Sequence, residues 1–145
     1  MAHTYNVNYI HCVFSTKHRL PLIHEPARAW ATIREVARAS KIKVLAVGGT
    51  ANHVHLLISV PSTRSVSEVV RELKCNSSLR IRKSNRLFSW QNGYESISVS
   101  PSAIKAVQRY IDCQEAHHAK RSFEEEYTAI LEHVGVKYDP EYVFD

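Results

Sequence analysis

Two apolar segments that flank a short polar turn constrain the fold more than any other feature of the chain. They read KIKVLAVGG (residues 41–49) and HVHLLISV (residues 53–60), and β-branched side chains are frequent in both. Gly48 and Gly49 at the end of the first segment, and Asn52 just before the second, are residue types that favour a tight turn. The two segments therefore predict an antiparallel β-hairpin.

The rest of the chain alternates between strand and helix patterns around this hairpin. A Tyr-, Val- and Ile-rich strand precedes the hairpin, and a further strand follows an irregular loop. Apolar residues at helical spacing predict the helices. The order β-α-β-β-α-β-α-α predicts an α+β protein. Its first six elements match a ferredoxin-like (RRM-like) antiparallel sheet with helices packed on one face. The expected elements outside the hairpin are a strand over 5–15, helices over 25–40, 65–85, 100–120 and 122–135, and a strand within 87–100.

Capping residues indicate where two of these helices begin and where the last one ends. Ser65 stands three residues before Glu68, and Ser122 three residues before Glu125, which is the spacing of a capping box. Gly135 follows the final apolar periodic segment and is typical of a helix C-terminus.

Composition limits the class of protein. The chain has 145 residues, 44% hydrophobic and 23% charged, which predicts one globular domain over residues 1–145. Its three cysteines are far apart and odd in number, so we expect a reducing, cytoplasmic setting. No apolar run has the length of a bilayer span, so we expect no membrane partner. The net charge of +5 favours a polyanionic partner.

His53 and His55 lie one residue apart within the second apolar segment. In a strand, residues i and i+2 point to the same face, so the two imidazoles are expected side by side, with Leu57 continuing that face. Such a pair is a natural platform for a divalent cation. Hydrogen bonds alone can equally satisfy two strand histidines, and the spacing does not decide between these interpretations. A metal site would need further ligands from elsewhere in the chain.

Tyr110 and Gln114 are four residues apart in the helix predicted over 100–120, which places them about 40° apart around its axis. A tyrosine and an amide oxygen could therefore be presented together at the edge of the core. Alternatively, Tyr110 is a half-buried core aromatic and Gln114 a surface residue. Both flank the apolar stripe that should face the sheet, formed by Ile104, Val107 and Ile111.

Basic residues concentrate in and after the helix predicted over 65–85. Aromatic residues follow closely, and basic groups beside stackable rings suit single-stranded or distorted nucleic acid. The alternative is a solvated helix face with ordinary core aromatics. His117 and His118 are neighbours on a helix, about 100° apart around its axis, and we expect them on the surface or facing DNA. The candidate DNA contacts are Arg71, Lys74, Arg80, Arg82, Lys83, Arg86 and Trp90.

Four ordered segments resemble the IS200/IS605-type single-tyrosine transposases of the HUH endonuclease superfamily. They read HVHLLI, WQNGYESISVS, YIDCQEAHH and SFEEEY, and the opening VFSTKHRLP is similar to that family's first strand and turn. The resemblance implies that His53, His55 and Gln114 are metal ligands. It also implies that Tyr110, on a C-terminal helix, is the catalytic nucleophile. Asn52 stands at the position before the first histidine, where many relatives carry an acidic residue. This difference bears on how finely the metal site is adjusted and not on the chemistry that it performs.

The resemblance further implies a DNA transposase that cleaves and rejoins single-stranded DNA beside a hairpin at the element end. Tyr110 would attack phosphorus with the help of Mg²⁺ or Mn²⁺, forming a 5′-phosphotyrosyl intermediate and releasing a 3′-OH. No general base stands out in the sequence. A homodimer is also implied, in which the tyrosine of one subunit can serve the histidine pair of the other. The alternative is a non-catalytic, domesticated module that binds single-stranded or hairpin nucleic acid, although the RNP aromatics of such modules are absent.

Overall fold

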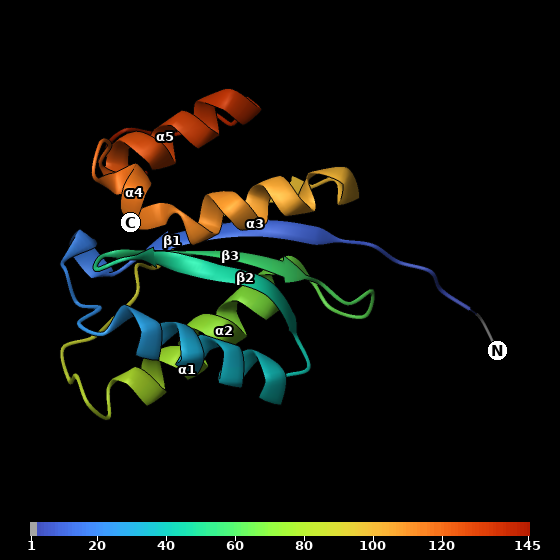
Figure 1. Cartoon of the computed structure of the whole chain (residues 1–145), viewed down its shortest axis with the longest axis horizontal. Helices are drawn as coiled ribbons and strands as arrows, with labels where there is room; N and C mark the ends of the chain where they lie inside the picture. Colours follow the sequence, from blue (N-terminus) through green and yellow to red (C-terminus); the bar gives the residue numbers. More distant parts are fainter. Residues whose placement is uncertain (1–2) are drawn as a thin grey trace.

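The structure is a computed structural model that describes residues 3–145, and a four-stranded antiparallel sheet forms its centre (Figure 1). Its strands are β1 Tyr9–Ser15, β2 Lys43–Thr50, β3 His53–Ser59 and β4 Glu95–Val99. They are ordered β2-β3-β1-β4, so β1 and β3 are central and the predicted hairpin forms one side of the sheet. This order, with helices in the crossovers, is the ferredoxin-like arrangement expected from the sequence.

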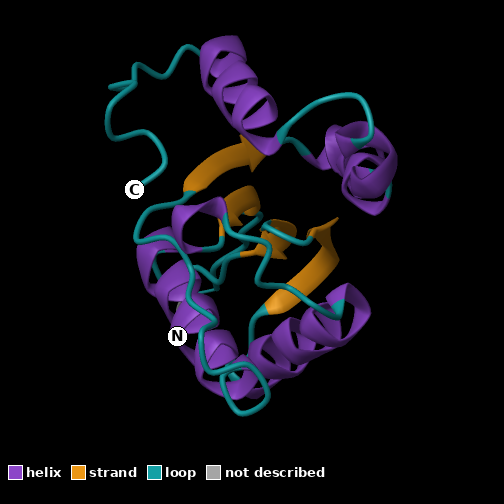
Figure 2. Cartoon of the chain, turned by 90° about the vertical axis from the view of Figure 1, so that its left-hand side faces the viewer, coloured by secondary structure: helices purple, strands orange, loops and turns teal. Residues whose placement is uncertain are grey.

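Helices cover both faces of the sheet. They are α1 Pro26–Ala39, α2 Val66–Ile81, α3 Ile104–Asp112, α4 Gln114–His118 and α5 Phe123–Val134, with 3₁₀ turns η1 at Lys17–Arg19 and η2 at Pro101–Ala103. α1 and α2 pack on one face as expected, whereas α3 to α5 lie on the opposite face (Figures 1 and 2). The packing on one face that the first six elements predict is therefore confirmed for α1 and α2, and the additional helices α3 to α5 cover the other face. Within residues 3–145, no helix is long and apolar enough to cross a membrane.

Side chains of β3 alternate between two separate layers of the interior. Leu57 packs with Ile111 of α3. Because successive strand residues point to opposite faces, His53 and His55 share the face of Leu57 and lie beneath the C-terminal helices. The other residues of the strand are buried in the main core beneath α1 and α2: Val54, Leu56 and Ile58.

Three elements differ from their predicted bounds. The helix predicted over 65–85 ends at Ile81. The first strand begins at Tyr9 instead of residue 5, because its pairing partners Ser59 and Val99 are the last residues of β3 and β4. The helix expected over 100–120 begins as a 3₁₀ turn and is interrupted at Cys113, whose φ of −101° and ψ of 20° leave the helical region. α3 and α4 are therefore separate helices, and side chains after the break point in new directions.

The capping residues act as predicted. Ser65 Oγ accepts a hydrogen bond from the Glu68 N–H at 3.2 Å, and Ser122 Oγ accepts one from the Glu125 N–H at 3.1 Å. Gly135 ends α5 with a φ of 76°, a left-handed conformation that glycine adopts without steric penalty.

Gly48 of β2 allows α3 to approach the sheet closely. A Cβ atom at this position would lie 2.4 Å from the Ile111 carbonyl oxygen, far inside van der Waals contact. Ile111 stands between Tyr110 and Gln114 in the sequence. The close approach at Gly48 therefore sets the height of both side chains above β3.

We expect Gly48→Ala to push α3 away from the sheet and to lower the free energy of unfolding by about 1–3 kcal/mol, the usual range for overpacking. Urea unfolding followed by circular dichroism measures this change. Gly135→Asn is the control, because Asn tolerates the left-handed conformation and nothing lies within 4 Å of a Cβ there. Equal unfolding midpoints for Gly48→Ala and the wild type would contradict the close approach.

Candidate active site

His53 and His55 lie side by side on the α3 face of β3, as the spacing predicts. Their ring centroids are 5.3 Å apart, and both side chains are fully buried. The C-terminal helices cover this face of the sheet (Figure 1). Most of the groups that complete the site therefore come from the last part of the chain.

Hydrogen-bond partners orient both imidazole rings from behind. His53 Nδ1 lies 2.9 Å from Asn52 Oδ1 and 3.0 Å from Thr50 Oγ1, so Nε2 of this ring points into the site. His55 Nδ1 lies 2.8 Å from His11 Nε2, which turns His55 Nε2 in the same way. Outer partners of this kind fix the orientation and the tautomer of ligand histidines in metal sites.

Tyr110 and Gln114 both reach the histidine pair despite the helix break between them. Gln114 Oε1 is 3.2 Å from His53 Nε2, and Gln114 Nε2 donates to the Tyr110 carbonyl oxygen. The half-buried Tyr110 ring lies edge-on to His55, with centroids 5.7 Å apart. A hydroxyl and an amide oxygen from the C-terminal helices thus meet the strand histidines in one place.

Glu126 of α5 connects Tyr110 to the histidines. Its Oε1 lies 2.7 Å from His55 Nε2, and its Oε2 accepts a hydrogen bond from the Tyr110 hydroxyl. Sequence reasoning missed this residue. Glu126 falls on the buried stripe of α5 beside Phe123 and Tyr127, and a carboxylate on an apolar helix face is the signal that could have revealed it.

His118 also belongs to the site, which corrects the expectation that it lies on the surface. Its Nε2 is 3.0 Å from Gln114 Oε1 and 3.2 Å from Glu126 Oε1, and its side chain is only 11% exposed. The break at Cys113 changes the phase of α4, so that His118 turns inward while His117 stays exposed.

The assembled side chains are compatible with a divalent metal site. His53, His55, His118 and Glu126 each offer one donor atom, and these atoms all lie within 4.8 Å of one another. The Gln114 amide oxygen borders the same space. Buried imidazoles and a carboxylate are donor types that divalent cations accept.

Burial governs the charge state of this cluster. Burial first, and the proximity of His55 second, lowers the pKa of His53 and of His11 to about 3. Burial also lowers the pKa of His55. It raises the pKa of Glu126, but the hydrogen bond with His55 and other partners outweigh this, and the net pKa lies below its usual range. Neutral imidazoles and an anionic carboxylate are the states that bind a cation.

The Tyr110 hydroxyl is protonated in this environment. Burial, followed by the hydrogen bond to Glu126, raises the pKa of Tyr110 above its ordinary value. A phenol becomes a better nucleophile when nearby positive charge favours its ionised form. Cleavage by Tyr110 would therefore need a cation beside it.

The predicted DNA contacts lie on α2 and the segment after it, on the face of the sheet away from the histidines. Trp90 packs in the core and donates its indole N–H to Ser77 Oγ. The Lys74 ammonium donates to the carbonyl oxygens of residues 91–93. These two side chains thus have structural roles of their own. The other predicted contacts are exposed at the surface: Arg71, Arg80, Arg82, Lys83 and Arg86.

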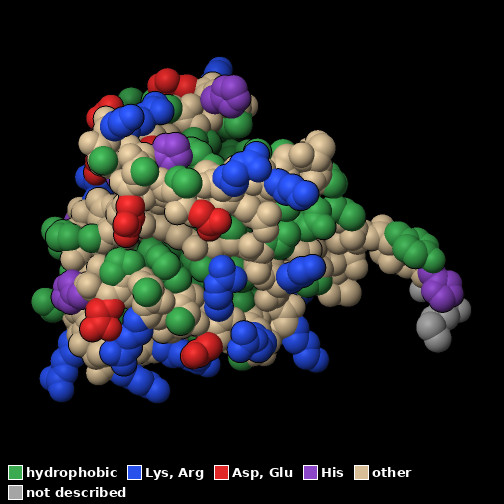
Figure 3. Space-filling view, in the orientation of Figure 1, with side chains coloured by type: hydrophobic (Ala, Val, Ile, Leu, Met, Phe, Trp, Pro, Cys, Tyr) green, Lys and Arg blue, Asp and Glu red, His purple; other side chains and the backbone are tan. Residues whose placement is uncertain are grey.

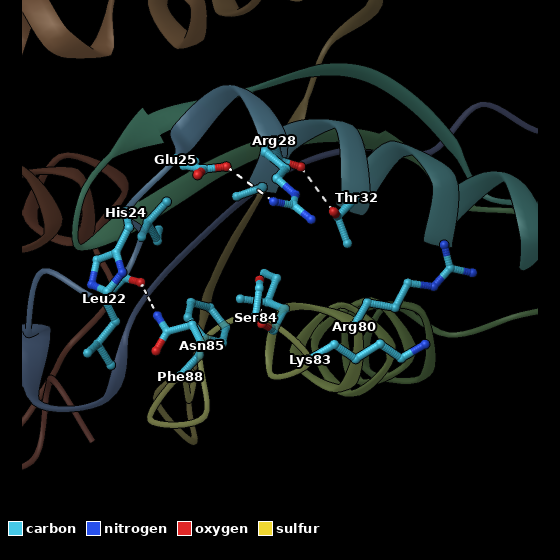
Figure 4. A pocket seen from close by; sticks show the side chains of 13 residues that line it. Leu22, His24, Glu25, Arg28, Thr32, Arg80, Lys83, Ser84, Asn85 and Phe88 are labelled. Carbon is cyan, nitrogen blue, oxygen red and sulfur yellow. Dashed lines mark hydrogen bonds and ion pairs between the residues drawn. The ribbon is translucent and has the colours of Figure 1, made fainter.

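A cavity of about 320 Å³ opens between the start of α1 and the end of α2 (Figure 4). Arg80 and Lys83 line it from one side and Arg28 from the other. Lys and Arg side chains also gather along the lower edge of the molecule, beneath these two helices (Figure 3). This basic surface and the histidine cluster lie on opposite sides of the sheet.

A ferredoxin-like sheet whose paired strand histidines face a helical tyrosine is the arrangement expected from the resemblance to the single-tyrosine transposases. The sequence profile of the family described as "Transposase IS200 like" matches residues 4–114. The chain belongs to this family and is accordingly a DNA transposase. The match ends at Gln114, so His118 and Glu126 lie beyond the segment that the profile covers.

Individual relatives agree with this assignment. The transposase for insertion sequence element IS200 of Salmonella typhimurium is 32% identical over 126 residues, covering 79% of this chain and 81% of the relative. The crystal structure of a predicted transposase from Deinococcus radiodurans R1 has a TM-score of 0.62 at 20% identity, over 79% of this chain and 96% of that one. A REP-associated tyrosine transposase, bound to a REP hairpin, has a TM-score of 0.55 at 16% identity, over 83% and 72% of the two chains.

Glu95 of β4 is a second buried carboxyl group near the site, outside the metal-ligand cluster. Neither of its oxygens has a hydrogen-bond partner among the residues described by the structure. Burial, and then the charge of Glu126, raises the pKa of Glu95 from 4.5 to about 8. The folded protein therefore holds the carboxyl proton of Glu95 more tightly than the unfolded chain does. The free energy of unfolding that comes from this tighter proton binding is lost as pH rises through 8.

We expect Glu95→Gln, which removes this ionisable group, to gain stability relative to the wild type as pH rises from about 5 to about 8.5, by about 1 kcal/mol or more. Urea unfolding of both proteins across this pH range gives the difference. Glu125→Gln is the control, because Glu125 is exposed and Gln can also accept the Ser122 hydrogen bond. A difference between Glu95→Gln and the wild type that does not vary with pH would show that Glu95 is ionised throughout.

Proposed function

We propose that this transposase, as one domain over residues 1–145, cleaves and rejoins single-stranded DNA with Tyr110 as nucleophile. We further propose that His53, His55 and Gln114 hold a divalent cation, Mg²⁺ or Mn²⁺. One observation carries the proposal: His55 and Tyr110 contact the two oxygens of the same buried carboxylate, Glu126. The nucleophile and the cation-binding histidines therefore belong to one site.

The residues divide the chemistry of cleavage between them. The Tyr110 oxygen attacks the scissile phosphorus and the bond from phosphorus to the 3′ oxygen breaks. The phosphorus stays on Tyr110 as a 5′-phosphotyrosyl ester, and the 3′ oxygen takes up a proton from solvent and leaves as a free 3′-OH. Glu126 Oε2, which accepts the hydrogen bond of the hydroxyl, is the acceptor placed at its proton. A bound divalent cation supplies Lewis-acid polarisation of the phosphate. Because the phosphotyrosyl ester retains the phosphodiester energy, a later 3′-OH reverses the step and joins new ends without ATP.

The exposed cations on α2 and after it are proposed to hold the DNA backbone. Arg71 and Arg82 line one pocket beside α2, and Arg80 and Lys83 line another between α1 and α2. Together with the exposed Arg86 they supply positive charge around this helix, and phosphate contacts of this kind position nucleic acid without reading sequence. The REP hairpin bound by the structurally similar transposase supports a hairpin as the partner. Lys74 and Trp90 are not part of this proposal because both side chains already form hydrogen bonds within the protein.

A homodimer is part of the proposal. The Tyr110 ring centroid lies 5.7 Å from the His55 ring centroid of its own chain, which supports a site assembled in cis. A dimer that exchanges its C-terminal helices would form the same site between subunits, because α3 to α5 carry Tyr110, Gln114 and Glu126 together.

We expect wild-type protein to form an SDS-resistant covalent adduct with single-stranded hairpin DNA in Mg²⁺ or Mn²⁺. Tyr110→Phe should reduce adduct formation by about 10³-fold or more, because it removes the nucleophilic oxygen. A gel that resolves free from DNA-linked protein measures this. Tyr94→Phe is the control, because Tyr94 packs against the core on the other face of the sheet. Adduct formation by Tyr110→Phe at the wild-type level would refute the proposed mechanism, and DNA binding without an adduct in either protein would favour the non-catalytic alternative.

A further inference from the structure

Two site residues lie beyond the segment that the family profile matches. His118 and Glu126 follow Gln114, where the match ends, and both are turned into the histidine cluster. The Glu126 side chain is 4% exposed and that of His118 is 11% exposed. Such burial of a carboxylate and an imidazole requires specific partners, because unpaired polar groups in the interior are unfavourable.

The partners of these two residues converge on one small space. Glu126 Oε1 is 2.7 Å from His55 Nε2, 3.2 Å from His118 Nε2 and 3.9 Å from His53 Nε2. Gln114 Oε1 lies on the other side, 3.2 Å from His53 Nε2 and 3.0 Å from His118 Nε2. Two acceptor oxygens and three ring nitrogens thus face one another.

Hydrogen bonds alone do not satisfy every ring nitrogen and oxygen of this cluster. A neutral imidazole has one N–H, and His53 directs its Nδ1 at Asn52 Oδ1, an acceptor that takes this proton. His53 Nε2 then presents a lone pair toward Gln114 Oε1, whose own lone pairs face it. The Gln114 amide is oriented by the donation of its Nε2 to the Tyr110 carbonyl. A ring nitrogen and an amide oxygen whose lone pairs face one another, beside a buried carboxylate, are the ordinary surroundings of a cation.

We infer that His118 and Glu126 are cation ligands in addition to His53, His55 and Gln114. The site is then nitrogen-rich, with three imidazoles, one carboxylate and one amide oxygen. Mg²⁺ favours oxygen ligands and retains water, whereas imidazole suits the later transition metals, with affinity rising from Mn²⁺ to Cu²⁺. The inference rests on the proposed function and sharpens it: of Mg²⁺ and Mn²⁺, the donor set selects Mn²⁺ and its heavier neighbours.

Glu126 has a second task in this arrangement. With Oε1 directed at the cation space, Oε2 remains on the Tyr110 hydroxyl. One carboxylate therefore sets the position of the nucleophile relative to the cation. α5 supplies this carboxylate, which gives the helix a role in the site and not only in covering the sheet.

The test uses Co²⁺ as a spectroscopic probe on the metal-free full chain. Visible absorption follows binding, and proton NMR counts the imidazole N–H signals that the paramagnetic ion shifts. We expect three shifted imidazole N–H signals in the wild type, one each from His53, His55 and His118, and an unchanged absorption spectrum when equimolar Mg²⁺ is added. Two shifted signals would overturn the inference without any substitution, as would displacement of Co²⁺ by equimolar Mg²⁺.

Substitutions provide the second arm. His118→Ala and Glu126→Gln should each weaken Co²⁺ binding by about tenfold or more. The controls His133→Ala and Glu125→Gln, on exposed positions of α5, should bind as the wild type does. Wild-type affinity in His118→Ala and Glu126→Gln, with loss of binding only in His53→Ala, would overturn the inference and leave the proposed function intact. Absence of Co²⁺ and Mn²⁺ binding by the wild type would contradict both.

Discussion

The arrangement of the site depends on the hydrogen bonds of one group, the carboxylate of Glu126. It contacts His55 of β3 with one oxygen and Tyr110 of α3 with the other, while its own backbone belongs to α5. Three elements that are distant in the sequence therefore meet at one anionic group in a buried setting. A hydrogen bond to a charged group stabilises more than one between neutral groups, and removal of one buried partner leaves the others unsatisfied.

The sheet supports this arrangement by separating two kinds of packing. One face of β3 contributes Val54, Leu56 and Ile58 to the main core. The strand is therefore held in place independently of the site. The other face is free to present histidines, with Asn52 and His11 orienting them from behind. Because Gly48 has no side chain, α3 packs close to the sheet, and at this distance Tyr110 and Gln114 reach the two histidine rings. Stability and chemistry thus depend largely on different side chains of the same strand.

Local sequence patterns predicted most of the fold, because hairpin residues, helix periodicity and capping boxes act over a few positions. The strand period placed His53 and His55 together. The helix period predicted Tyr110 and Gln114 on one side of a single helix, and they do meet, although the helix breaks at Cys113 between them. The inward turn of His118 could not be predicted, since it depends on the break at Cys113. Glu126 was hidden because its partners are 16 and 71 residues away. The sequence predicts Trp90 as a DNA contact, yet its ring packs in the core against Phe14 and Phe88, which only the assembled fold reveals.

The central claim is that the buried cluster around Glu126 is an active site whose nucleophile is Tyr110. The most direct test is tandem mass spectrometry of wild-type protein digested with trypsin and nuclease after incubation with single-stranded DNA. Cleavage after Arg109 and Lys120 releases YIDCQEAHHAK, which contains a single tyrosine. A nucleotide linked through a phosphodiester to Tyr110 in this peptide is the result predicted. A nucleotide linked to any other residue, with this peptide unmodified, would contradict the account.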